Sequence, residues 1–116
     1  MIESEVIAAV TLAVDVSREL DDDHVEFWRL ATNLRRSLPS ADGELIRGLA
    51  RAVLVALLDR GVVLGDLDGD TGEFTAWPAT VASIDIAMAA WRSLGRDPDM
   101  GEIAWLSRPS SLDDGD

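Results

Sequence analysis

Residues 42–60 constrain the fold most, because apolar side chains surround most of the helix that this segment predicts. In its first half the arginines, such as Arg47, lie opposite an apolar stripe. In its second half Val55 and Leu58 occupy the side of those arginines. A helix that is apolar on all sides is normally enclosed by other elements, so we expect this helix at the centre of the core. The predicted core residues are Leu49, Val53, Leu57, Phe27, Leu34, Ile84, Met88 and Trp91.

Three further helices are predicted over residues 3–20, 24–38 and 80–94, from apolar residues at steps of three and four. Asp23 and Glu26 have the spacing of a capping box, which favours a helix start at that point. The first helix is expected to turn one apolar stripe toward the core. Its members are Ile2, Val6, Ala9, Val10, Ala13, Val16 and Leu20.

Residues 62–64 and 74–77 predict two short strands around a loop rich in turn residues. Asp97 followed by Pro98 is typical of a helix start, which predicts a short helical turn near the C-terminus. The expected fold class is mostly α: four helices, one short β-hairpin between helices three and four, and a winged-helix-like order. We expect one helical domain over residues 1–106 and a flexible acidic tail over 107–116.

The amino-acid composition excludes most classes of catalytic site. The chain has no cysteine and only one histidine, His24, which excludes thiolate chemistry and sites with several histidines. It contains no lysine, no G-x-S-x-G motif and no glycine-rich phosphate loop. The acids 66, 68 and 70 do not fit a calcium loop, because Thr71 and Trp77 stand where Gly and Glu are needed. We expect no enzyme activity, no cofactor and no bound metal.

The charge is strongly acidic, with 22 carboxylates against 10 basic residues and a net charge of −12. Such a charge favours a basic protein partner and disfavours nucleic acid. Residues 25–60 are the exception, because this segment contains six arginines and only four acidic residues. With the winged-helix-like order, this leaves a DNA-binding regulator as the alternative. The predicted basic patch contains Arg29, Arg35, Arg36, Arg47 and Arg51.

The helix over residues 80–94 has two apolar sides, and one of them suffices to dock it on the core. We expect the other side to form a homodimer interface. The first helix or the C-terminal segment of Trp105 is a rival cover for that side, and the first helix also needs a partner for Ile7 and Val14, which lie outside its own stripe. Because tryptophan is enriched at interfaces, we add two of the four tryptophans, Trp28 and Trp105, to the predicted interface. The predicted interface residues are Ala82, Ile86, Ala89, Ala90, Trp28 and Trp105.

The location is expected to be the cytoplasm. Glu3 and Glu5 precede the first apolar stretch without a basic residue, unlike in a signal peptide. The longest uninterrupted apolar run, 52–58, is far shorter than the roughly 20 residues that span a bilayer. We therefore expect no membrane association.

About half of the chain also resembles a group of small actinobacterial proteins that end in a Gly-Arg-Asp-Pro segment followed by a tryptophan. The segments that carry the resemblance are 57–63, 65–67, 74–78, 94–98 and 101–105, together with Trp91. The resemblance implies a bacterial cytosolic origin and a shared fold, but no activity. The sequence thus predicts a non-catalytic acidic interaction module, in the manner of an immunity protein or antitoxin.

Overall fold

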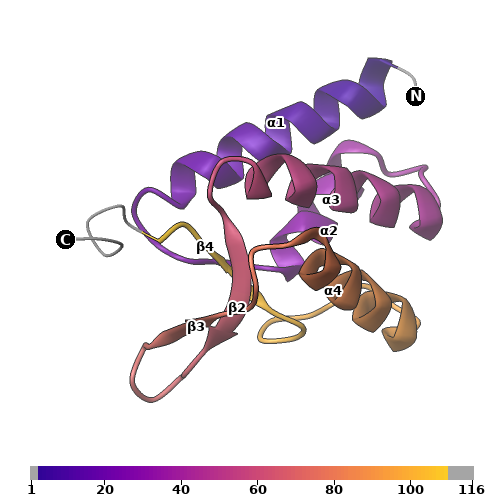
Figure 1. Ribbon diagram of the computed structural model, residues 1–116. Coiled ribbons are helices and arrows are strands. Elements are labelled where there is room, and N and C mark those ends of the chain that lie inside the picture. The colour runs from indigo at the N-terminus through magenta and orange to yellow at the C-terminus, as the bar shows by residue number, and fades with distance from the viewer. Residues whose placement is uncertain (1–2, 110–116) are drawn as a thin grey trace.

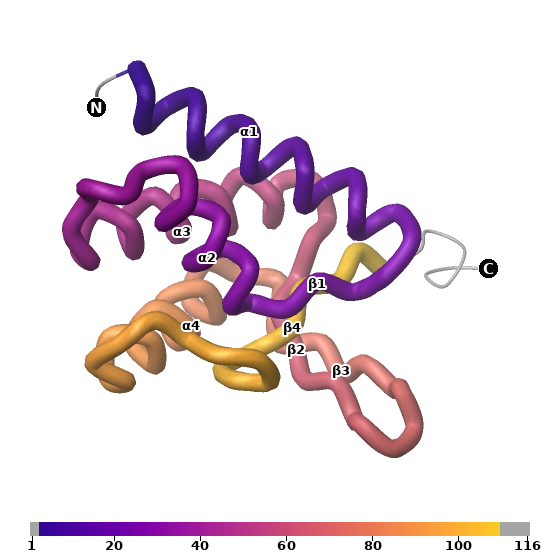
Figure 2. Tube along the Cα trace, turned by 180° about the vertical axis from the view of Figure 1, so that it is seen from behind, coloured from indigo at the N-terminus to yellow at the C-terminus, as the bar shows by residue number. Residues whose placement is uncertain are grey.

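In the computed structural model, which describes residues 3–109, four helices gather on one side of a small β-sheet (Figure 1). The N-terminal helix lies along the outside of the helical layer (Figure 2). The last strand of the sheet, near the C-terminal end, lies between the strand that precedes the second helix and the strand that follows the third. The elements are α1 (Glu3–Glu19), β1 (Val25–Glu26), α2 (Trp28–Ser37), α3 (Gly43–Leu58), β2 (Val63–Leu67), β3 (Phe74–Ala76), α4 (Val81–Leu94) and β4 (Trp105–Ser107).

The sheet has four antiparallel strands in the order β1-β4-β2-β3. The C-terminal strand β4 therefore lies between β1 and β2. Val25, Leu106 and Leu64 pair across these three strands and are all buried. The predicted fold class is wrong: β2 and β3 are part of a larger sheet rather than an isolated hairpin, and the predicted C-terminal helical turn does not form.

The second helix begins at Trp28, later than predicted, because the expected capping box does not form. The Asp23 carboxylate accepts a hydrogen bond from the backbone N–H of His24, at 2.7 Å. Glu26 accepts one from the backbone N–H of Gly101, at 2.8 Å. Neither carboxylate is directed at a helix N-terminus, and the residues 25–26 pair with β4 instead.

The predicted helical turn after Pro98 is absent because its capping residue has another partner. The Asp97 carboxylate binds the Arg35 guanidinium, at 2.9 Å, instead of capping a helix. Arg96 and Glu102 form two hydrogen bonds of 2.8 Å that close the following loop. Ile103 then takes a positive φ of 70°, a left-handed conformation that is uncommon for a β-branched residue. This loop leads the chain into β4.

The Arg96–Glu102 pair that closes this loop predicts how Glu102 titrates in acid. Hydrogen bonds from Arg96 and from the backbone of Asp99 lower the pKa of Glu102 from 4.5 to about 2. Because the folded pKa lies below the unfolded one, the stabilisation is complete above about pH 4.5 and is lost as the pH falls through about 2. Carboxyl NMR titration should show this midpoint, and Arg96→Gln should move it toward 4.5. An unchanged midpoint in that variant would contradict the pairing.

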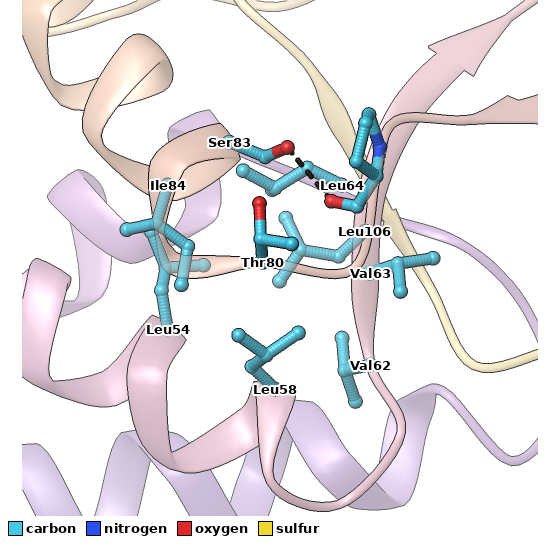
Figure 3. Close-up of a pocket in the computed structure, with 10 residues that line it drawn as sticks. Leu54, Leu58, Val62, Val63, Leu64, Thr80, Ser83, Ile84 and Leu106 are labelled. Carbon is cyan, nitrogen blue, oxygen red and sulfur yellow. Dashed lines mark hydrogen bonds between the residues drawn. The ribbon is translucent and has the colours of Figure 1, made fainter.

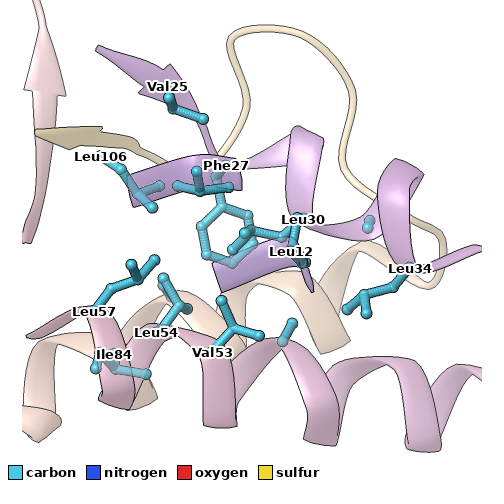
Figure 4. Packing of buried hydrophobic residues seen from close by; sticks show 14 of the residues in the cluster. Leu12, Val25, Phe27, Leu30, Leu34, Val53, Leu54, Leu57, Ile84 and Leu106 are labelled. Atoms are coloured by element: carbon cyan, nitrogen blue, oxygen red, sulfur yellow. The ribbon is translucent and has the colours of Figure 1, made fainter. Parts of the chain in front are cut away.

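The core is built around α3, which packs against α1, α2 and α4. All eight predicted core residues are buried, with at most 8% of any of them exposed, so that prediction is confirmed. Figure 4 shows Val53, Leu54 and Leu57 of α3 directed toward Phe27 and Leu106. The Phe27 ring also meets the Trp91 ring edge-on, with centroids 5.8 Å apart.

The buried face of α1 differs from the predicted stripe. Ala8, Leu12 and Val16 are buried, whereas Val6 and Val10 are exposed. The buried residues follow a constant step of four, which keeps them on the side where α2 and α3 lie against α1. The predicted stripe combined residues from this face with residues from the solvent-facing side. The helix consequently carries a second apolar face.

Gly65 in β2 is a position where a side chain has no room. A Cβ atom there would lie against the carbonyl oxygen of Thr75 and 2.5 Å from Cζ of Phe74. We expect Gly65→Ala to lower the free energy of unfolding by roughly 1–3 kcal/mol, as overpacking does. Gly69→Ala is the matched control, because a Cβ at Gly69 meets nothing within 4 Å. Urea unfolding should separate the two variants, and equal midpoints would contradict the close approach.

Candidate interaction site

The arginines of the predicted basic patch are largely engaged in ion pairs with carboxylates of other segments. Three of the five patch arginines form such pairs, which join α2 to α1, α2 to the loop after α4, and α3 to α4. The pairs are Arg29–Glu19 at 2.8 Å, Arg35–Asp97 at 2.9 Å and Arg51–Asp85 at 2.9 Å. Hydrogen bonding to Asp85 raises the pKa of Arg51, and that of Asp85 is lowered in return. These arginines therefore connect elements of the fold.

The other two patch arginines lie in different surroundings. Arg36 is beside Asp15 in a groove between α1 and α2. Arg47 lies at the start of α3 near the Arg35 guanidinium, and its Nε is buried without a hydrogen-bond partner among residues 3–109. The three paired arginines thus reach α1, α4 and the loop after α4, whereas Arg36 and Arg47 form no ion pair within residues 3–109.

A groove of about 500 Å³ lies where the end of α1 meets β3 and the C-terminal strand. His24 stacks on Phe74 in this groove, with ring centroids 5.2 Å apart and planes 15° from parallel. Arg108 lies beside them and binds the Asp21 carboxylate, at 2.7 Å. We call this the acidic groove; it is lined by Leu20, Asp21, Asp22, Asp23, His24, Phe74, Ala76, Ser107, Arg108 and Pro109.

The acids of this groove follow from how α1 ends. Backbone hydrogen bonds from residues 21–23 to the carbonyls of Arg18 and Glu19 fold them into a turn directly after the helix. Three carboxylates then sit at the negative end of the helix dipole, where a cation is favoured and an anion is not. Arg108 offsets one of them. The groove is therefore a place where added positive charge is stabilised.

The acidic loop between β2 and β3 is held by its own hydrogen bonds. The Asp68 carboxylate accepts from the backbone N–H groups of Asp70 and Thr71, at 2.8 and 3.1 Å. Outside the loop, Asp66 of β2 accepts a hydrogen bond from the indole Nε1 of Trp77, which follows β3, at 3.0 Å. Within residues 3–109 no group of three His, Asp or Glu side chains is placed to hold a metal ion.

Comparison with protein-family models, with curated proteins and with solved structures finds no match. The actinobacterial resemblance therefore stays a prediction. Among the helices of residues 3–109, none is long and apolar enough to cross a membrane.

A small cavity between α3, β2 and α4 is too small for a ligand (Figure 3). Its volume is about 10 Å³, which holds at most about one water molecule. Leu54, Leu58 and Ile84 line it, and the one dashed contact is the hydroxyl of Ser83 donating to the carbonyl of Pro78, at 2.7 Å. This cavity belongs to the core.

The predicted interface residues lie on three elements. The small apolar residues of α4 are exposed, as is Ile86, with 63% of its surface accessible. Trp28 begins α2 and Trp105 lies in β4, and both are half-buried. Within residues 3–109, neither α1 nor the segment of Trp105 covers the α4 face, which comprises Ala82, Ile86, Ala89 and Ala90.

The second, exposed apolar face of α1 was not predicted from the sequence, which indicated a single stripe turned toward the core. Val6, Ile7, Val10 and Val14 are 42–57% exposed and supply four of the seven large apolar residues that are exposed within residues 3–109. A cavity of about 370 Å³ runs beside this face, between α1 and α3. The available signal was that Ile7 and Val14 lay outside the predicted stripe.

Proposed function

We propose that the protein is a non-catalytic interaction module that binds a basic protein partner. The observation that carries this proposal is the pairing of arginines across the fold. Arg29, Arg35 and Arg51 are committed to carboxylates of the same chain, and the overall charge is −12. Within residues 3–109 five of the ten arginines are paired with carboxylates of the same chain. Because the chain has 22 carboxylates, its surface offers mainly negative charge to a partner, and complementary charge speeds and selects association.

The acidic groove is the proposed contact for that partner. An arginine or lysine side chain entering it would meet the carboxylates of residues 21–23 and the ring of Phe74. A cation near an aromatic face gains about 0.5–2 kcal/mol in addition to its ion pairs. Masking a basic surface in this way suits an immunity protein or antitoxin of the bacterial cytosol.

DNA binding receives less support from the same observations. Affinity for a duplex depends on arginines and lysines that neutralise several phosphates. Three of the five patch arginines are neutralised within the chain, by Glu19, Asp97 and Asp85, rather than by the nearby acids Glu26, Asp42, Glu44 and Asp59. Asp42 instead caps α3 through the backbone N–H of Leu45. The pairing of these arginines therefore disfavours DNA as the partner.

The test compares binding of a labelled arginine-rich peptide and a labelled DNA duplex, by fluorescence anisotropy. The triple variant Asp21→Asn, Asp22→Asn, Asp23→Asn removes the charge of the groove and keeps side-chain oxygens that accept hydrogen bonds. We expect it to weaken peptide binding by about tenfold or more, which corresponds to about 1.4 kcal/mol. The wild type should bind the duplex more weakly than the peptide.

A matched control separates the groove from general charge attraction. Glu44→Gln, Asp59→Asn and Asp70→Asn together change the net charge by the same amount, at three exposed positions outside the groove. We expect this control to weaken peptide binding by less than about threefold, as expected for peripheral charges. Equal losses in both triple variants, or tighter binding of the duplex, would contradict the proposed function.

A further inference from the structure

The outward face of α1 forms one continuous stripe. Ile7, Val10 and Val14 follow steps of three and four, so they lie on the same side of the helix. That side is opposite the buried residues Leu12 and Val16. Each of the three is 42–57% exposed, which is unusual for neighbouring large apolar side chains.

The stripe ends in opposite charges. Glu3 lies four residues before Ile7, and Arg18 lies four residues after Val14, so both extend the same face. Arg60, in the turn after α3, lines the same cavity as Arg18 and adds positive charge at that end. Within residues 3–109, Glu3 and Arg18 form no ion pair. We call residues 3, 7, 10, 14 and 18 the α1 stripe.

We propose that a second copy of this chain binds the α1 stripe, with the two α1 helices antiparallel about a two-fold axis. This alignment places Glu3 opposite the partner subunit's Arg18, and Ile7 opposite the partner subunit's Val14. Val10 then lies at the axis. A parallel alignment would instead bring Glu3 against its own copy. The stripe is thus self-complementary in charge and in apolar surface, as a two-fold interface requires.

The cavity beside the stripe fits the same arrangement. It is lined by Val10, Val14 and the small residue Ala56 of α3, and its volume of about 370 Å³ exceeds that of one large aliphatic side chain. The partner's Ile7, which faces Val14, lies at its mouth. An apolar side chain that enters a recess of this kind loses contact with water, which is the main favourable contribution to association.

The exposed face of α4 is the competing interface, and a matched substitution distinguishes the two. Val10→Asp and Ile86→Asp place the same charge on exposed apolar positions of two helices. Sedimentation velocity from about 5 to about 200 μM covers the affinities of a small interface. We expect the wild type and Ile86→Asp to form a species of twice the 12.5 kDa chain mass, and Val10→Asp to remain a monomer.

A charge exchange tests the antiparallel alignment itself. Glu3→Arg and Arg18→Glu should each weaken the dimer by about threefold or more, because each brings like charges together. The double variant restores opposite charges and should recover the wild-type dimer. A monomeric wild type at the highest concentration, dissociation by Ile86→Asp alone, or no recovery in the double variant would overturn the proposal. The groove variants at residues 21–23 should leave the dimer intact, so this test is independent of the basic partner.

Discussion

Replacing Trp91 with alanine should lower the free energy of unfolding by about 3–5 kcal/mol, as for other buried aromatic residues. The side chain is 1% exposed and is the largest of the fully buried ones. Its ring meets the Phe27 ring at 86°, an edge-to-face contact that adds to the loss of buried area. The free energy of unfolding of a small domain is about 5–15 kcal/mol in total, so this variant should lose a large share of its stability.

A phenylalanine at the same position keeps an aromatic ring in the core and removes the indole N–H. The Nε1 atom of Trp91 is buried and has no hydrogen-bond partner among residues 3–109. A buried donor without a partner costs about 1–3 kcal/mol, and Trp91→Phe removes that cost while it removes part of the ring. We expect Trp91→Phe to lose clearly less stability than Trp91→Ala in urea unfolding. Equal losses in the two variants would contradict the role of aromatic packing at this position.

The core could be predicted from the sequence because helical periodicity is a local signal. Leu49, Val53 and Leu57 are four residues apart, and each is at most 2% exposed in the structure. The same reasoning placed α3 at the centre, because apolar residues surround most of its second half. In the structure Ala52 and Ala56 of that half are nevertheless exposed. In α1 the signal was ambiguous, because apolar residues such as Ile7 and Leu12 lie on both faces.

The strands β1 and β4 could not be predicted in the same way. They contain two and three residues, too few for an alternating pattern. Their pairing depends on distant parts of the chain, since Val25 faces Leu106. The capping residues Asp23 and Asp97 were interpreted from local spacing alone. Asp23 accepts a hydrogen bond from the neighbouring backbone N–H of His24, and Asp97 binds the distant Arg35, so only the second capping signal was overridden by a tertiary contact.

At the candidate site, too, local sequence could not predict which charged residues pair with one another. A count of arginines over residues 25–60 indicates a basic region, but it does not identify the partner of each arginine. Arg35 binds Asp97, which is 62 residues away. Similarly, the acidic groove joins residues 21–23 to Arg108, across nearly the whole described chain. Local composition therefore predicted the acidic character of the surface and not its geometry.

Replacing Leu57 with alanine should lower the free energy of unfolding by about 2–5 kcal/mol, because the cavity it leaves opens between three elements. Leu57 is 2% exposed, and Figure 4 shows it near Leu106 of the central strand. Its backbone carbonyl accepts hydrogen bonds from Arg60 and Val62, which start the turn into β2. The packing of Leu57 therefore supports both the helical layer and the sheet.

Leu58→Ala is the matched control for this variant, since it makes the same change at the next residue. Leu58 is half-buried at the edge of the same cluster, so less apolar area returns to water and the remaining space can fill with solvent. We expect its loss to be less than half that of Leu57→Ala in urea unfolding monitored by circular dichroism. An unchanged midpoint for Leu57→Ala, or equal losses at the two positions, would contradict a central α3, because the order of the two effects depends on which face of α3 is enclosed.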